Sequence, residues 1–328
     1  RKFIDMYAGR LRNQVSFMLS ACNFYMPIFE EALDAYGLPL ELRYLPIIES
    51  ALNPSAVSRA GASGLWQFMI GTGKIYGLES NSLVDERRDP IKATWAAARY
   101  LKEMYDIYGD WNLVIAAYNC GPGTINKAIR RANGETDYWK IYNYLPKETR
   151  GYVPAFIAAN YVMTYYCDHN ICPMETNIPA STDTVQVNKN LHFEQIADLC
   201  NVPLDQIKSL NPQYKKHMIP GDSKPYTLRL PIDAISTFID KQDTIYAHRA
   251  DELFRNRKTV AVKEITPSTR KTTAAVAGKG KLTYYTIKSG DTLSTIAGKY
   301  GVTIKDIQRW NGMSNTKIAA GKRLKIYK

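Results

Sequence analysis

Glu49 is the residue in this sequence that is best placed for acid–base chemistry. It lies in the apolar segment 45–52, beside Ile47 and Ile48. Apolar neighbours desolvate a carboxyl group and raise its pKa, so that it stays protonated near neutral pH and can give its proton to a leaving oxygen. The sequence therefore predicts a general acid for glycoside cleavage. The alternative is an exposed glutamate in the last turn of a helix that ends before Pro54.

Three further segments carry side chains suited to binding a sugar. Residues 64–67 are Gly-Leu-Trp-Gln, residues 117–121 are Ala-Tyr-Asn-Cys-Gly, and residues 148–153 are Glu-Thr-Arg-Gly-Tyr-Val. The amide side chains of Gln67 and Asn119 can donate and accept hydrogen bonds at once, which suits N-acetyl and hydroxyl groups. These segments supply the binding groups that a glycoside-cleaving acid needs.

In this order, and together with Glu49 and Ser50, the segments resemble the four motifs of the soluble lytic transglycosylase domain, a relative of goose-type lysozyme. Residues 58–69 resemble, nearly word for word, the membrane-bound lytic murein transglycosylase D family. The resemblance covers roughly residues 40–165, and the ordered set is more specific than any one motif. It implies a mainly α, lysozyme-like catalytic domain.

The resemblance also implies the reaction, that of a peptidoglycan lyase. Lytic transglycosylases cut the bond between N-acetylmuramic acid and N-acetylglucosamine without water, because the muramyl C6 hydroxyl attacks C1 and closes a 1,6-anhydro ring. One glutamate serves both steps: Glu49 protonates the departing oxygen, and its carboxylate then accepts the proton of the C6 hydroxyl. Most glycosidases use two carboxylates for these tasks.

Motif matching implies roles for the residues around Glu49. Ser58 is implied to polarise the reacting sugar or its N-acetyl group, and Tyr152 to lie near the catalytic acid. The residues implied for substrate binding are Ser50, Gln67, Tyr118, Asn119 and Glu148. The structural alternatives are turns at Gly61 and Gly64, core packing of Trp66 and Phe68, and pairing of Glu148 with Arg150.

Two other functions fit the same motifs. A goose-lysozyme-like peptidoglycan hydrolase would share Glu49 but add water, so its products would have reducing ends. A non-catalytic scaffold that binds the cell wall would keep the fold without the activity. Products with 1,6-anhydro ends would distinguish the transglycosylase from both.

The net charge of +12 is concentrated in the second half of the chain. Residues 1–170 hold 18 Lys and Arg against 17 Asp and Glu, whereas residues 171–328 hold 25 against 14. Such a charge attracts polyanions, including nucleic acid, anionic membranes and cell walls whose stem peptides carry carboxylates. Because the basic residues crowd into one segment without a base-reading or stacking element, we expect no specific nucleic-acid partner. The expected partners are peptidoglycan glycan strands.

Helices must position the motif residues, because apolar side chains recur at three- and four-residue spacing through the first 175 residues. The segments with this spacing are 30–36, 40–49, 91–108, 113–118, 125–132 and 152–166. Asp89 before Pro90 predicts a helix start, and Gly109 predicts its end. The charged segment 85–89 is predicted to cap and pair locally, and not to supply a second catalytic carboxylate.

The second half of the chain contains an internal repeat with an offset of 100 positions. The matched residues are Val187 and Ile287, Phe193 and Leu293, Ile196 and Ile296, Ala197 and Ala297, Val202 and Val302, Leu204 and Ile304, Ile207 and Ile307, and Asn211 and Asn311. Each copy is predicted to be a small α+β module, a strand, two short helices and a closing strand (βααβ). The closing strands are expected at 228–230 and 324–326.

The second copy, residues 285–311, resembles the LysM module, which binds glycans that contain N-acetylglucosamine. The first copy departs from that pattern at 190–192 and has extra residues around 214–224. A structural role and sugar recognition both stay open for it. The residues that the resemblance implies for glycan binding in the second copy are Gly290, Asp291 and Thr292.

Four parts are expected along the chain. They are a lysozyme-like domain with an N-terminal helical extension (1–175), a degenerate LysM-like module (183–232), a helical segment with a basic flexible linker (233–281), and a LysM module (282–328). Residues 255–281 hold eight basic residues against one acidic residue, which predicts the linker.

The five cysteines lack metal-ligand spacing, and no metal or cofactor is expected. Cys167 and Cys172 can close a small loop in an oxidising compartment, with free buried thiols as the alternative. Cys120 is expected to be a small packing residue.

No stretch reaches the roughly 18 consecutive apolar residues of a membrane span, and residues 156–167 are expected to form a buried helix. The chain begins at Arg1 without a signal peptide, so we expect a processed or trimmed chain. The resemblance implies the periplasm or cell envelope, with an outer-membrane tether outside this chain.

Overall fold

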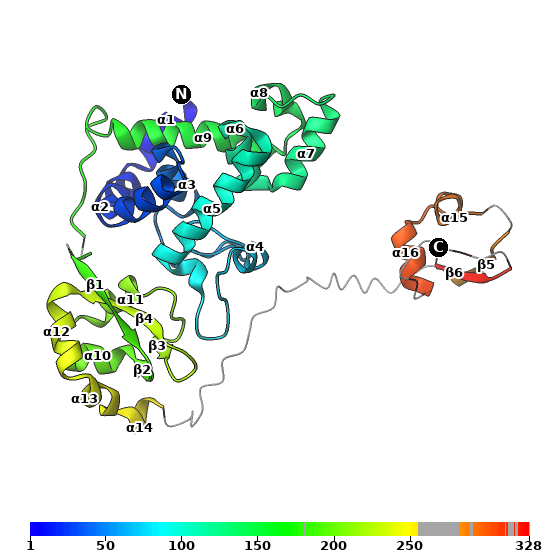
Figure 1. Ribbon diagram of the computed structural model, residues 1–328. Coiled ribbons are helices and arrows are strands. Elements are labelled where there is room, and N and C mark those ends of the chain that lie inside the picture. The colour runs from blue at the N-terminus through cyan, green and yellow to red at the C-terminus, as the bar shows by residue number, and fades with distance from the viewer. Residues whose placement is uncertain are drawn as a thin grey trace. The chain divides into compact units, whose positions relative to one another are not determined.

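The computed structural model describes residues 1–176, 178–179, 181–254, 282–288, 291–311, 313, 318 and 321–327 of the chain. The chain divides into two units, Arg1–Pro267 and Ser268–Lys328 (Figure 1). The predicted linker 255–281 and Gly290 lie outside the described residues. Within the described residues, no helix has the length and apolar character needed to cross a membrane.

The first part of unit 1, here called the helical domain (residues 1–175), confirms the predicted mainly α fold. Its helices are α1 (Lys2–Asp5), α2 (Arg12–Ala35), α3 (Leu45–Ser50), α4 (Ile70–Ile75), α5 (Pro90–Tyr108), α6 (Trp111–Cys120), α7 (Pro122–Arg131), α8 (Tyr138–Ile141) and α9 (Lys147–Thr164). A π-helical turn lies at Met6–Arg10, and 3-10 turns lie at Leu40–Tyr44, Glu86–Arg88 and Tyr142–Tyr144.

The predicted helices are present with shifted ends. Segments 91–108, 113–118, 125–132 and 152–166 lie largely within α5, α6, α7 and α9. Segment 30–36 is the end of the much longer α2, which begins at Arg12. Segment 40–49 is divided between a 3-10 turn and α3, where Pro46 occupies one of the first helical positions because its missing N–H is not needed there.

The predicted boundaries of α5 are confirmed. The Asp89 side chain accepts a hydrogen bond from the backbone N–H of Ile91 at 2.9 Å, and Gly109 ends the helix with φ 62°. The charged segment before α5 also pairs locally, as expected, since Arg87 and Asp85 form an ion pair at 2.8 Å.

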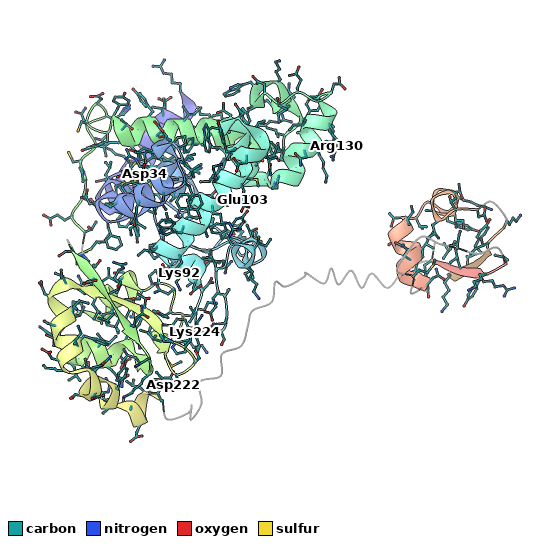
Figure 2. All side chains as sticks on the ribbon, in the orientation of Figure 1. Asp34, Lys92, Glu103, Arg130, Asp222 and Lys224 are labelled. Carbon is teal, nitrogen blue, oxygen red and sulfur yellow. The ribbon has the colours of Figure 1, made fainter. Side chains whose placement is uncertain are left out.

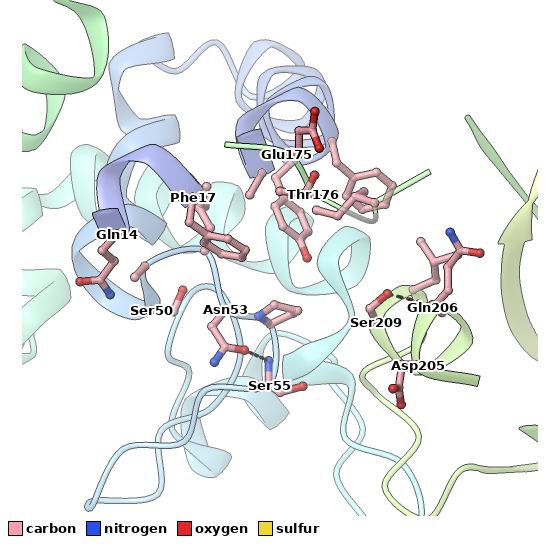
Figure 3. A pocket seen from close by; sticks show the side chains of 18 of the residues that line it. Gln14, Phe17, Ser50, Asn53, Ser55, Glu175, Thr176, Asp205, Gln206 and Ser209 are labelled. Atoms are coloured by element: carbon pink, nitrogen blue, oxygen red, sulfur yellow. Dashed lines mark hydrogen bonds between the residues drawn. The ribbon is translucent and has the colours of Figure 1, made fainter. Parts of the chain in front are cut away.

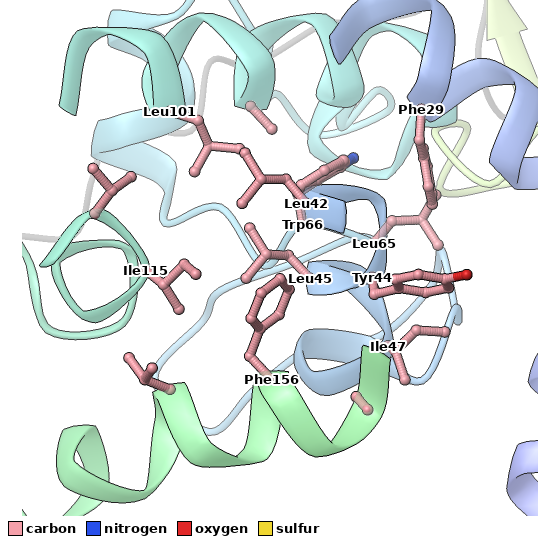
Figure 4. Packing of buried hydrophobic residues seen from close by; sticks show 14 of the residues in the cluster. Phe29, Leu42, Tyr44, Leu45, Ile47, Leu65, Trp66, Leu101, Ile115 and Phe156 are labelled. Carbon is pink, nitrogen blue, oxygen red and sulfur yellow. The ribbon is translucent and has the colours of Figure 1, made fainter. Parts of the chain in front are cut away.

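The core of the helical domain surrounds α3 (Figure 4). Buried side chains at its centre come from α2, α3, α5, α6, α9 and the segment before α4; they are Phe29, Leu45, Trp66, Leu101, Ile115 and Phe156. The Trp66 ring packs edge-on against Phe29, with 5.3 Å between centroids, and its Nε1 donates to Thr94 Oγ1 at 2.9 Å. The short helix that carries Glu49 is therefore held from several sides.

The first module follows the helical domain within unit 1. Its strands are β1 (Thr182–Val187), β2 (Asn190–His192), β3 (Met218–Pro220) and β4 (Tyr226–Pro231), and its helices are α10 (Phe193–Cys200), α11 (Leu204–Leu210), α12 (Ile232–Asp240), α13 (Gln242–Ala247) and α14 (Ala250–Leu253). β1 pairs antiparallel with β4, with Val185 opposite Leu228, and β2 pairs antiparallel with β3. Phe238 and Ile245 are buried in the same core as α10, so α12 and α13 belong to this module's packing.

The second module, in unit 2, has a strand, two helices and a closing strand that correspond to β1, α10, α11 and β4 of the first. β5 (Leu282–Thr286) pairs antiparallel with β6 (Arg323–Tyr327), and α15 (Leu293–Tyr300) and α16 (Ile304–Asn311) lie between them in the chain. The repeat holds in detail: Asn211 Nδ2 donates to the Ile207 carbonyl at 2.9 Å, and Asn311 Nδ2 donates to the Ile307 carbonyl at 2.8 Å. The predicted βααβ pattern is confirmed in both copies.

The helical domain inserts a loop into the first module. Leu83 and Val84, 2% and 0% exposed, belong to the hydrophobic core of that module. The backbones also pair, because Asp85 N donates to the Gln213 carbonyl at 2.9 Å and Lys215 N donates to the Leu83 carbonyl at 2.8 Å. The first module therefore shares its core with the helical domain.

Charged side chains surround this insertion. Lys215 Nζ lies 3.7 Å from Asp85 Oδ2, and Lys224, labelled in Figure 2, pairs with Glu79 at 2.6 Å. These contacts come from residues 214–224, where the first copy has residues in excess of the LysM pattern. The departure thus has a structural reason, contact with the helical domain.

The cysteine hypothesis needs correction. Cys167 and Cys172 are not bridged, and both are exposed, so neither the predicted disulfide nor the alternative of buried thiols describes them. They follow the end of α9 at the surface, where the apolar spacing of that helix stops and the Tyr166 side chain lies beside Cys167. Cys200 is buried, and Cys22 and Cys120 are partly buried.

Candidate active site

Glu49 lies in the last turn of α3, which ends because the next residues leave the helical conformation. Ala51 and Leu52 adopt left-handed backbone angles, with φ of 52° and 58°. Non-glycine residues rarely do so, and the conformation costs about 1–2 kcal/mol per residue. Despite its place at a helix end, the Glu49 side chain is partly buried and lines a cavity of about 410 Å³.

Burial raises the pKa of Glu49 to about 7. Two neighbours modify this effect in opposite directions. A hydrogen bond from Tyr152 lowers the pKa because it stabilises the carboxylate, and the negative charge of Glu148 raises it. Among the described residues that line this cavity, Glu49 alone carries a carboxyl group. The site therefore contains one group that can exchange a proton near neutral pH.

Two tyrosines surround this carboxyl group. The Tyr152 hydroxyl, on α9, donates to Glu49 Oε1, and the Tyr118 hydroxyl, on α6, donates to the Trp66 carbonyl at 2.7 Å. Burial, with a further contribution from the negative charge of Glu49, holds the pKa of both hydroxyls well above the usual 10. Both tyrosines therefore remain hydrogen-bond donors.

The Gln67 amide is fixed in one orientation. Its backbone is left-handed, with φ 50°, and its Nε2 donates to the Gly64 carbonyl at 2.9 Å and the Ala56 carbonyl at 3.3 Å. Because two carbonyls occupy the nitrogen side, the Oε1 atom is the acceptor that remains for a ligand. Gln67 lines the cavity of Glu49.

Ser58 lines the same cavity and is exposed to solvent. Its Oγ accepts a hydrogen bond from the backbone N–H of Ala62 at 3.0 Å. This bond closes the turn before Ser63 and leaves the hydroxyl proton for donation.

Asn119 lies in an adjoining cavity of about 290 Å³. Gln67 lines both cavities, and Tyr118 lines the second one. The Asn119 Oδ1 accepts from the Thr149 hydroxyl at 2.9 Å, which fixes the amide. Cys120 lines this cavity too, and burial raises the pKa of its thiol, which agrees with a packing residue and not a nucleophile.

Ser50 connects two motifs. Its Oγ lies 2.9 Å from the Leu65 carbonyl and 3.1 Å from the Pro46 carbonyl, so its proton is directed at the backbone. Ser50 also lines the cavity of Glu49, where its oxygen can still accept. Its contacts hold α3 against the Gly64–Gln67 turn.

Glu148 is exposed in the first turn of α9, close enough to Glu49 for its charge to act on that residue. The structural alternative placed it in an ion pair with Arg150. Arg150 donates instead to the carbonyls of Leu145 and Asn143, at 2.9 and 2.7 Å.

The other structural alternatives, core packing of two aromatic residues and turns at two glycines, are also observed. Trp66 and Phe68 are core residues, 0% and 3% exposed. Gly61 and Gly64 both have left-handed φ, near 89° and 87°, as turns require.

In the second module, two of the three residues implied for glycan binding are described. Asp291 Oδ2 accepts hydrogen bonds from the Lys288 backbone N–H and the Tyr285 hydroxyl, both at 2.8 Å. Thr292 exchanges hydrogen bonds with Thr295 at the start of α15. Both residues shape the turn that precedes this helix.

Sequence reasoning missed the wall that the N-terminal helices contribute. Tyr7, Gln14 and Met18 line the cavity of Glu49, and burial raises the pKa of Tyr7 to about 12. Apolar residues of α2 at three- and four-residue spacing, such as Val15, Met18 and Leu19, could have predicted that this helix begins well before residue 30.

Among the described residues, no group of three or more His, Cys, Asp or Glu could hold a metal ion.

Family models match three parts of the chain. A model of the transglycosylase SLT domain matches residues 26–141, one of the lytic transglycosylase MltD LysM-like domain matches 181–247, and one of the LysM domain matches 285–326. The chain therefore carries an SLT domain, followed by an MltD-type LysM-like domain and a LysM domain.

Individual relatives agree with this assignment. The chain is similar to membrane-bound lytic murein transglycosylase D of Escherichia coli (strain K12), with 33% identity over 294 residues, which are 88% of this chain and 60% of the relative. The chain thus spans less than two thirds of that relative. It is also similar to soluble lytic murein transglycosylase of E. coli (strain K12), with 33% identity over 124 residues, 36% of this chain and 19% of the relative.

A solved structure of the 70 kDa soluble lytic transglycosylase SLT70 from E. coli is also similar. It has 29% identity and a TM-score of 0.38, covering 44% of this chain and 24% of that chain.

Proposed function

We propose that this chain cleaves the β-1,4 bond between N-acetylmuramic acid and N-acetylglucosamine in peptidoglycan and leaves a 1,6-anhydro ring. The observation that carries the proposal is the lone carboxyl group of Glu49 in its cavity, with a pKa raised to about 7. A hydrolase of the usual kind needs a second carboxylate to activate water or to attack C1. One carboxyl group suits a reaction in which the substrate supplies the nucleophile.

In the proposed reaction, protonated Glu49 gives its proton to the glycosidic oxygen as the bond from C1 to that oxygen breaks. The C6 hydroxyl then attacks C1, and its proton passes to the Glu49 carboxylate. One bond breaks, one forms, and Glu49 regains its proton. Because both reacting groups belong to one sugar, the protein's task is mainly to hold O6 near C1.

The neighbouring residues have distinct proposed roles. Tyr152 orients the carboxyl group and stabilises its ionised form through the hydrogen bond to Oε1. Gln67 Oε1 accepts from a substrate hydroxyl or N-acetyl N–H, and the Ser58 hydroxyl donates to the reacting sugar. Tyr118, Asn119, Ser50 and Glu148 are proposed to bind or shape the substrate groove.

The remaining predictions are also part of the proposal. We propose that residues 1–175 are a catalytic part, 183–232 the βααβ part of a LysM-like module, 233–281 a connecting part whose first helices, α12 and α13, pack on that module, and 282–328 a LysM module. The last module binds glycan near Gly290, Asp291 and Thr292, and so keeps the enzyme on its polymer. The proposed location is the cell envelope.

The test is mass spectrometry of the fragments released from purified peptidoglycan. The proposal expects 1,6-anhydromuramyl ends, which resist borohydride reduction, and no release by Glu49→Gln. Reducible muramyl ends, heavier by one water per cut, would replace the proposal with the hydrolase. No fragments from the intact chain would favour the non-catalytic scaffold.

A further inference from the structure

A second, larger cavity of unit 1 lies between the helical domain and the first module (Figure 3). Its volume is about 1200 Å³, above the roughly 300–1,000 Å³ of most small-molecule sites. Phe17 of α2 and Glu175 after α9 lie on one side, Asn53 and Ser55 lie after α3, and Ser209 of α11 lies across from them. Two parts of the chain that are distant in sequence thus form one cavity.

The side chains around this cavity suit an uncharged sugar. Phe17 is 40% exposed on α2 and can pack against the apolar face of a pyranose ring. The Asn53 oxygen accepts from the Ser55 backbone N–H at 2.9 Å, which leaves the NH2 group as the part of the amide that can donate to a ligand. Among the described residues that line the cavity, there is no Lys or Arg, whereas Glu175 and Asp205 are acidic; Asp205 pairs with Lys208 at 3.0 Å. The negative charge of Glu175 disfavours the carboxylates of stem peptides.

The cavity continues into the candidate active site. Gln14, Ser50 and Ala51 line both this cavity and the cavity of Glu49. Gln67 in turn lines both the Glu49 cavity and the one that contains Asn119. A polymer that passes Glu49 can therefore extend from the Asn119 cavity as far as α11.

Both walls of the cavity are fixed. The first module is held by the insertion of Leu83 and Val84 into its core. On the other side, Met174 N donates to the Ser16 carbonyl at 3.2 Å, and the Ser20 hydroxyl donates to the Met174 carbonyl, so the segment before Glu175 is held on α2. The cavity is thus a preformed feature, as binding sites for small ligands usually are.

We propose that this cavity binds N-acetylhexosamine residues of the same glycan strand that is cleaved at Glu49, with α11 of the first module as one wall. The inference rests on the proposed function for the identity of the strand. If the proposal holds, the first module takes part in substrate binding through α11. Its repeat pattern does not identify this surface as a binding surface. The second copy has Lys305 and Arg309 at the positions that correspond to Asp205 and Ser209.

The test uses the full chain and peptide-free glycan strands separated by length. Ser209→Arg introduces into the cavity the residue type that the second copy has at the corresponding position, Arg309. Ser236→Arg, at an exposed position on α12, is the matched control. Phe17→Ala removes the exposed ring, with Ile107→Ala, 62% exposed on α5, as its control. We expect KM for long strands to rise about tenfold in Ser209→Arg and Phe17→Ala, with unchanged kcat and unchanged values for the shortest cleaved strands.

Binding separates this inference from the proposed function. Strand affinities are measured in the Glu49→Gln background, with and without Ser209→Arg, by equilibrium titration. Length-dependent affinity that Ser209→Arg removes would support the cavity even if the intact chain formed no anhydro ends. Equal behaviour of Ser209→Arg and Ser236→Arg at every length would overturn the inference, as would an effect confined to strands that still carry stem peptides.

Discussion

At the scale of single residues, Glu49 is governed by the balance between burial and one hydrogen bond. Desolvation raises its pKa to about 7, while the Tyr152 hydroxyl stabilises the ionised form and lowers it. The result lies near the pH at which a group can both give and take a proton, which is where acid–base catalysis is most effective. Without Tyr152 the carboxyl group would hold its proton to higher pH.

The pH dependence of activity tests this balance. Since the proposed reaction starts from protonated Glu49, kcat/KM is expected to fall as pH rises through about 7. Tyr152→Phe removes the interaction that lowers the pKa, so the fall should move up by about one pH unit or more, alongside a lower maximal rate. Glu148→Gln removes the charge that raises the pKa, so the fall should move down by roughly a few tenths of a unit.

The control for this experiment is Glu31→Gln, an exposed glutamate of α2. Its profile should coincide with that of the unmodified chain. The assignment of the acid would be contradicted if Tyr152→Phe and Glu148→Gln moved the profile in the same direction, or if neither moved it.

Most of the residues around Glu49 could be predicted because they stand in ordered motifs. Ser58 and Gln67 line its cavity, and Tyr152 donates to its carboxyl group. Tyr7 and Gln14, which line the same cavity, stand in no motif. Their role depends on how α2 and the π-helical turn before it pack on the domain, which is a property of distant contacts and not of local sequence.

At the scale of elements, the turn between residues 61 and 68 depends on a close approach of two backbones. A Cβ atom at Gly64 would overlap the carbonyl of Arg87. The Arg87 guanidinium in turn donates to the carbonyls of Gly61 at 2.8 Å and Phe68 at 2.9 Å. One buried arginine thus joins the two ends of the turn that carries Gln67.

A comparison of Gly64→Ala with Gly61→Ala separates the cost of an unfavourable backbone angle from the cost of a steric overlap. Both glycines have φ near +90°, but nothing lies within 4 Å of a Cβ at Gly61. We expect Gly61→Ala to lower the free energy of unfolding by about 1–2 kcal/mol through backbone strain alone. Gly64→Ala should lower it by more than about 4 kcal/mol, because the Arg87 backbone must also move.

Denaturant unfolding of both variants measures the difference. Equal losses would mean that the contact with Arg87 is unimportant to the turn. The glycines could be predicted as turn residues from the sequence, but the contact at Gly64 could not, since it joins segments more than twenty residues apart.

At the scale of the whole of unit 1, the helical domain and the first module share apolar packing. Leu83 and Val84 belong by sequence to the helical domain and by burial to the module. The repeat predicted the module's strands and helices, because each copy has its own periodic pattern. It could not predict this insertion, since residues 83 and 84 stand in a polar, charged stretch that indicates a surface loop.

Leu83→Ala tests the shared packing. The side chain is 2% exposed, so its removal should lower the free energy of unfolding by about 2–5 kcal/mol and increase hydrogen exchange in β1, β4 and α10 of the module. Leu40→Ala, at a position 44% exposed, is the control and should change stability by less than about 0.5 kcal/mol. Equal effects of the two substitutions would show that the module does not depend on the inserted loop.

The insertion of Leu83 and Val84 also sets an order of events during synthesis. The ribosome makes these two residues well before β4, which closes the module's sheet at Tyr226–Pro231. Until that strand emerges, a nascent chain carries two apolar side chains that water still surrounds. The helical domain can therefore reach its final state only after translation has passed the first module.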